Sequence, residues 1–237
     1  MGPKKPRGRW INYQVGGLKW SEMWSTELSD EIMTMIGSDS RRHSSRLHDI
    51  SLRESFQMGA DRRMQWLQVD TVTRARVAGA DRMFLVYEGD PDMDVGRISV
   101  THLDDCRVGR HRFDVESRFV IFELIFERLL SEGETYVYGF RVNFADAFLT
   151  AADGDGVRPT PVEATEGVRA FRTQSNAYVL RAHFDPSALP VQCYQVRAGR
   201  ATEQQHDVRE VGLSRGSAHI ALSDVQPGVH GLRWDWE

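Results

Sequence analysis

Carboxylates at alternate positions are the first feature of this chain that could carry chemistry. Asp90, Asp92 and Asp94 follow one another at every second residue, as the oxygen ligands of a calcium-binding loop do. An EF-hand loop would next need glycine at its sixth position and glutamate at its twelfth, where this chain has Val95 and Thr101. The EF-hand match therefore fails. A looser calcium site stays open, and it would draw on two carboxylates of a later Gly-rich stretch, Asp153 and Asp155. The simpler interpretation is that Asp and Gly are the commonest turn residues.

A second polar group combines one imidazole with two carboxylates. His102, Asp104 and Asp105 lie close together in the chain, and such residues serve metal sites and acid/base dyads. Neither the HExxH motif nor a paired cysteine spacing accompanies them. A small-molecule enzyme with a shallow site at these residues is therefore kept as an alternative. The simpler interpretation is a strand end with solvated polar side chains.

Other catalytic signatures are missing from the sequence. It contains no Gly-rich P-loop and no dinucleotide-binding motif to cradle phosphates. The letters G-x-S-x-G occur once, at Gly212-Leu213-Ser214-Arg215-Gly216, but no helical pattern follows them as a nucleophile elbow requires. The two cysteines, Cys106 and Cys193, stand in alternating strand-like contexts, where a thiol usually packs as a small apolar group. We expect both thiols to be reduced and buried. These observations predict a protein that is not an enzyme and that has no cofactor and no metal.

Three tryptophans near the N-terminus are unusual in a polar segment. Trp10, Trp20 and Trp24 are candidates for contacts with a partner, because tryptophan is enriched at protein interfaces. The simpler interpretation is that the same residues dock onto the body of this protein.

Charge and hydropathy exclude some classes of partner. The net charge is -4 and the isoelectric point is about 6.1, so the chain as a whole is not an electrostatic binder of nucleic acid. The basic cluster of Lys4, Lys5, Arg7 and Arg9 could neutralise about four phosphates, which predicts weak DNA binding at most. No apolar region follows this basic start, and no run of 18 apolar residues occurs. We therefore expect a cytoplasmic protein that does not enter a membrane.

The hydrophobic pattern changes along the chain. Residues 1–47 read as a basic, partly disordered arm with one short helix, since Leu28, Ile32, Met35 and Ile36 follow helical spacing. From His48 onward apolar residues recur at every second position, and we expect this body to fold without the arm. A Gly- and Pro-containing stretch at 150–167 divides it into units 48–150 and 151–237, which pack either separately or as one domain.

Period-two alternation predicts about ten strands joined by tight turns. Alternating apolar residues occur in the following segments: 67–75, 120–126, 136–142, 178–184, 218–222 and 232–236. The segment 82–88 is apolar on both faces, as a central strand would be. No long amphipathic helix separates the strands, so the fold class is mainly β: an antiparallel β-sandwich, as one unit or two small ones side by side. Such a body brings exposed edge strands, which are templates for strand addition by a partner.

Several short motifs carry a family resemblance over about four-fifths of the chain. They are Gly79-Ala80-Asp81-Arg82, Tyr87-Glu88-Gly89-Asp90-Pro91, Leu103-Asp104-Asp105-Cys106-Arg107-Val108-Gly109, Gly133-Glu134-Thr135-Tyr136, Tyr178-Val179-Leu180-Arg181, Phe184-Asp185-Pro186, Leu189-Pro190 with Cys193, and Gly231-Leu232-Arg233-Trp234-Asp235-Trp236. From His48 onward the chain resembles the C-terminal β-rich region of actinobacterial XRE (Cro/C1-type) helix-turn-helix regulators. The resemblance implies an effector or interaction domain, without catalytic or ligand-binding residues to carry over. Residues 1–47 lack the helix-turn-helix pattern that these regulators place in front.

The sequence therefore predicts a non-enzymatic binding or interaction protein whose partner is another protein. A DNA-binding regulator that lacks its N-terminal domain here, and an enzyme at His102, Asp104 and Asp105, remain the alternatives.

Overall fold

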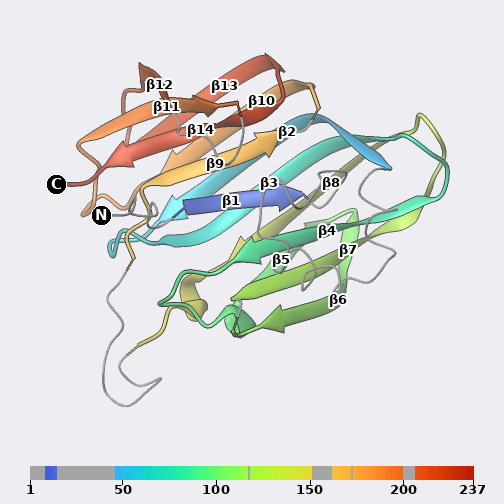
Figure 1. Ribbon diagram of the computed structural model, residues 1–237, viewed down its shortest axis with the longest axis horizontal. Coiled ribbons are helices and arrows are strands. Elements are labelled where there is room, and N and C mark those ends of the chain that lie inside the picture. The colour runs from blue at the N-terminus through green and yellow to red at the C-terminus, as the bar shows by residue number, and fades with distance from the viewer. Residues whose placement is uncertain (1–8, 15–45, 117, 151–161, 172, 200–205) are drawn as a thin grey trace.

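The computed structural model describes residues 9–14, 46–116, 118–150, 162–171, 173–199 and 206–237, the first of these segments by its backbone alone (Figure 1). In these residues the chain forms two sheets that face each other. The eight-stranded sheet has the order β12-β11-β14-β9-β1-β4-β7-β6, and the six-stranded sheet has the order β13-β10-β2-β3-β8-β5. The predicted fold class, a mainly β sandwich, is confirmed.

The eight-stranded sheet consists of β1 (Arg9–Gln14), β4 (Ala80–Glu88), β6 (Cys106–Asp114), β7 (Phe119–Leu130), β9 (Glu166–Phe171), β11 (Gln192–Ala198), β12 (His206–Glu210) and β14 (Gly228–Asp235). The six-stranded sheet consists of β2 (Leu47–Met58), β3 (Met64–Ala75), β5 (Ser99–Asp104), β8 (Thr135–Asn143), β10 (Ser175–His183) and β13 (Ser217–Val225). Two short 3-10 helices, η2 (Val95–Arg97) and η3 (Ala145–Ala147), lie in connections between strands.

The core lies between the sheets and is built by the alternation seen in the sequence. Strand β3 buries every second residue from Leu67 to Ala75, and β8 and β10 do the same with tyrosine, phenylalanine and leucine. The largest fully buried side chains include Phe56, Tyr138, Tyr178 and Trp234. Because these residues come from both sheets, their burial holds the two layers together.

Residues 9–14 of the N-terminal segment form a strand of the body. Strand β1 is an internal strand of the eight-stranded sheet, parallel to β9 with Trp10 opposite Gly167, and antiparallel to β4 with Tyr13 opposite Val86. Our assignment of residues 1–47 to an arm is therefore wrong for Arg9–Gln14. The expected helix around Leu28 to Ile36 lies outside the described residues.

The two predicted units share both sheets. Strands from 48–150 and from 151–237 meet through β1 in the larger sheet and through the parallel pair β2 and β10 in the smaller one. The pairing of β10 with β2 runs from Ala177 opposite Ser51 to His183 opposite Gln57. The body is therefore one sandwich, not two placed side by side.

Glu123 differs from the expected pattern of β7. Alternation along β7 puts Glu123 on the face opposite Phe122 and Leu124, where a polar residue is usually solvated, but only 2% of it is exposed. Burial alone would raise the pKa of Glu123, but hydrogen bonds from Arg110 and Arg82 outweigh it and lower the pKa to about 2. On the second face of β7, Glu123 therefore forms ion pairs with Arg82 and Arg110.

Candidate partner-binding edge

In the described residues the two sheets end in four edge strands, and three of them carry features that oppose strand addition. Strand β12 has only five residues, and its register shifts by a bulge opposite Gln195 and Val196. Strand β6 contains three arginines and a register shift between Val108 and His111. The register of β5 shifts between Thr101 and Asp104, and His102 has a φ of 48°. Short length, charge and bulges are the usual protection of a sheet edge.

The fourth edge strand, β13, has none of this protection over most of its length. It has nine residues, and its pairing with β10 is continuous from Ala218 opposite Ala182 to Ser223 opposite Ala177. The stretch Ser217–Ser223 contains no proline and no Lys, Arg, Asp or Glu. A long, regular and uncharged edge is the kind that accepts a further strand.

The hydrogen bonds at the start of β13 show which of its backbone groups point away from the sheet. Phe184 donates its N–H to the carbonyl of Gly216 at 2.8 Å, so Gly216 faces β10. Ser217 exchanges two backbone hydrogen bonds with Ser214 and so faces outward. Because this direction alternates along an antiparallel strand, the N–H and C=O groups of His219, Ala221 and Ser223 also face outward. In the described part of the chain, no backbone partner is seen for these three residues.

The larger sheet extends past β13 on this side of the molecule. Strand β14 contacts both β10 and β13, whereas β11 and β12 continue the eight-stranded sheet beyond β14. The six-stranded sheet ends at β13 (Figure 1). The inner faces of β11 and β12 therefore project over the position that a strand added to β13 would occupy.

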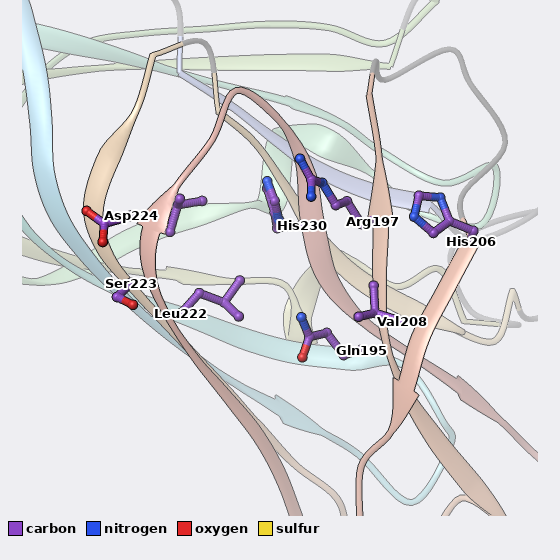
Figure 2. Close-up of a pocket in the computed structure, with 9 residues that line it drawn as sticks. Gln195, Arg197, His206, Val208, Leu222, Ser223, Asp224 and His230 are labelled. Carbon is purple, nitrogen blue, oxygen red and sulfur yellow. The ribbon is translucent and has the colours of Figure 1, made fainter.

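A cavity of about 330 Å³ lies at this place, and we call it the edge recess. Figure 2 shows Gln195, Arg197 and His206 on the side of β11 and β12, with Leu222, Ser223 and Asp224 on the side of β13. The remaining lining residues are Val208, Val225 and His230. The edge recess is thus continuous with the open edge of β13 through Leu222 and Ser223.

The polar side chains that line the edge recess keep hydrogen-bonding groups that their neighbours do not use. His230 donates from Nε2 to the carbonyl of Gln226 at 2.9 Å, and burial lowers its pKa, so the neutral imidazole keeps Nδ1 as an acceptor. Gln195 accepts from Nε of Arg209 at 2.9 Å through its Oε1, which leaves its amide N–H groups as donors. Among the described residues, Arg197 has no ion-pair partner, and Asp224 on the opposite wall does not pair with it. The recess can therefore offer both donors and acceptors to an incoming group.

The residues singled out in the sequence do not meet at this site. Trp10 lies in β1, in the interior of the larger sheet, and Trp20 and Trp24 lie outside the described residues. His102, Asp104 and Asp105 are exposed at the end of β5, on the far edge of the smaller sheet, where Nδ1 of His102 contacts Thr101 at 3.0 Å. Neither His111, which stacks on Phe122, nor His183, which bonds to Ser217, joins them.

Two of the three alternating aspartates, Asp92 and Asp94, accept hydrogen bonds from other groups of the protein. Asp94 accepts a hydrogen bond from the N–H of Gly96 at the start of η2. Asp92 accepts from Nη1 of Arg63 at 3.2 Å and from the N–H of Val162 at 3.1 Å. Burial is the main reason that the pKa of Asp90 is raised to about 7, and the negative charge of nearby Asp92 raises it further. Within the described ranges no group of three or more His, Cys, Asp or Glu is placed to hold a metal ion; Asp153 and Asp155 fall outside them.

The two thiols are free and buried, as expected. Cys106 donates to the carbonyl of Gly139 at 3.4 Å, and burial raises its pKa to about 11. Burial likewise raises the pKa of Cys193 to about 12.

In the described residues no helix has the length and apolar character needed to span a membrane.

The sequence predicts a sandwich with exposed edge strands, but it does not show that β13 is the open one. The alternation of Ala218, Ile220 and Leu222 predicted this strand. Its place at the edge depends on pairing with β10, about 40 residues earlier in the chain, and no local pattern encodes that partner.

Comparisons with known proteins assign no family. No protein-family model and no curated protein matches the chain. Among solved structures, an M1 zinc metallopeptidase from Deinococcus radiodurans is 13% identical with a TM-score of 0.44, over 81% of this chain and 43% of that one. A putative protease from Parabacteroides distasonis is 9% identical with a TM-score of 0.47, over 80% of this chain and 40% of that one. This chain thus spans less than half the length of either protein, and likeness at this level assigns no activity.

Proposed function

We propose that this protein is a non-enzymatic binding protein that holds another protein by accepting one of its strands at the edge of β13. The observation that carries the proposal is the unprotected outer side of β13 beside the projecting strands β11 and β12. Main-chain hydrogen bonds supply affinity in strand addition, and pockets for alternate side chains supply specificity. The edge of β13 provides the first and the edge recess provides the second. The resemblance to the effector regions of helix-turn-helix regulators is compatible with such a role.

A substitution at Ala221 tests the proposal. Its N–H faces outward, so Ala221→Pro should remove a donor from the open edge without breaking a hydrogen bond to β10. The probe is a capped, fluorescently labelled nine-residue peptide of alternating valine and threonine, and the readout is fluorescence polarisation. We expect the native protein to bind this peptide and Ala221→Pro to bind it about two- to tenfold more weakly, as loss of one backbone hydrogen bond implies.

The matched control is Ala221→Ser, which keeps the N–H and should bind like the native protein. Thermal unfolding of all three proteins checks that the sandwich is intact. Absence of binding to the native protein, or equal binding by Ala221→Pro, would contradict the proposal. Sedimentation supplies a second test: a native dimer that Ala221→Pro converts to a monomer would assign the edge to a second copy of this chain and overturn the role of a different partner.

A further inference from the structure

The side chains of an added strand would point alternately toward and away from β11 and β12. Successive side chains in a strand face opposite sides of the sheet. A strand bound to β13 extends the six-stranded sheet beneath the projecting strands, so every second side chain would face the wall that carries Gln195 and Arg197. These two residues, with His206 of β12, are the polar groups that such a side chain would meet (Figure 2).

The same wall favours a negatively charged group. Arg197 brings a permanent positive charge and five N–H donors, and none of the described acidic residues pairs with it. The amide N–H groups of Gln195 add donors beside it, because its Oε1 is taken by Arg209. Asp224 is the one acidic residue that lines the recess among those described, and Figure 2 shows its carboxylate on the far side from Arg197. A guanidinium binds a carboxylate through two parallel hydrogen bonds, which an amide or an ammonium group cannot reproduce.

Val208, Leu222 and Val225 border the same cavity and bring no charge to it. Arg197 and Val208 are exposed, so an ion pair formed there is partly screened by water and salt. A lysine side chain entering the edge recess would meet a like charge there, at a cost in free energy.

We propose that the strand bound at β13 carries an acidic side chain that enters the edge recess and pairs with Arg197. This inference rests on the proposed function and names the chemistry of the partner: an extended segment with a glutamate or aspartate at an inward-facing position.

Three capped nine-residue peptides test the pairing with Arg197. They share one valine–threonine sequence and differ only in the central residue, which is glutamate, glutamine or lysine. Fluorescence polarisation with the native protein should show the glutamate peptide binding about fivefold more tightly than the glutamine peptide, the size of a partly screened ion pair. The lysine peptide should bind most weakly. The advantage of glutamate should shrink as salt is added.

Arg197→Gln should remove the preference for the glutamate peptide over the glutamine peptide. The control is Arg53→Gln, which changes an exposed arginine of β2 in the other sheet and should keep the preference. Equal binding of all three peptides, or a preference that survives Arg197→Gln, would overturn this inference alone. Failure of every peptide to bind would instead count against strand addition at β13 itself.

Discussion

At the scale of single residues, the interior of the sandwich holds an ion pair as well as apolar side chains. Arg169 of β9 and Glu54 of β2 are 2% and 3% exposed, and the guanidinium donates to Oε1 of Glu54. Tyr178 donates to the other carboxylate oxygen at 2.8 Å, and Asp49 lies 4.0 Å from the guanidinium. The pair joins the two sheets near their centre, so both charges lose their hydration when the protein folds.

Removing one member of this pair should cost more than removing both charges. Arg169→Met leaves a buried carboxylate without its cation, and we expect a loss of about 3 to 5 kcal/mol in the free energy of unfolding. Adding Glu54→Gln to the same protein should recover part of that loss, because the neutral amide can still bond to Tyr178. Urea unfolding of the two variants measures the difference. A double variant less stable than Arg169→Met would contradict this account of the pair.

The thiols give a second prediction at this scale. Burial raises the pKa of Cys106 to about 11 and of Cys193 to about 12, so both remain protonated at pH 8. Since the thiolate is the reactive form, alkylation of the native protein by iodoacetamide should be slow at both cysteines and fast in denaturant. Mass spectrometry after timed labelling gives the two rates. Rapid modification of either cysteine in the native protein would contradict their burial.

At the scale of elements, the strands with long alternation could be predicted, and the short one could not. Strands β3, β8 and β10 are each nine or more residues long and bury alternate side chains on one face, which is enough to reveal their period. Strand β1 has six residues in a basic stretch, and its partner β9 begins about 150 residues later. The pairing of β1 with β9 therefore cannot be predicted from the local sequence, and neither can the position of β13 at an edge. The open site could not be predicted for the same reason: Arg197 and Leu222 border one cavity because of sheet order.

The internal position of β1 predicts that this short strand matters for stability. Proline at Asn12, opposite Arg169 in the parallel pair, places a residue without an N–H inside a sheet. We expect Asn12→Pro to lower the free energy of unfolding by about 2 kcal/mol, at the upper end of ordinary substitutions. Asn12→Thr keeps the N–H and is the control. Equal melting temperatures for the two variants would show that β1 contributes little to the sheet.

At the scale of the whole molecule, the unequal size of the two sheets produces the candidate site. Eight strands face six, and on one side the larger sheet projects past β13 over the edge recess. On the opposite side the chain passes from β5 directly to β6, so the edges of the two sheets are joined by the turn at Asp105. The chain also crosses between the sheets beside β13, through residues 211–216 from β12 and residues 226–227 to β14. The feature that distinguishes this side is the projecting part of the larger sheet, beneath which a strand from a partner would extend the smaller sheet.

Amide hydrogen exchange along β13 measures whether the outer side of this strand is open in the free protein. In the free protein the amides of His219, Ala221 and Ser223 should exchange rapidly, while those of Ala218, Ile220 and Leu222, which face β10, should exchange slowly. Addition of the valine–threonine peptide with a central glutamate should slow the first set and leave the second unchanged. If the outward amides are already protected in the free protein, or stay unprotected when the peptide is bound, then β13 is not the edge that accepts a partner strand.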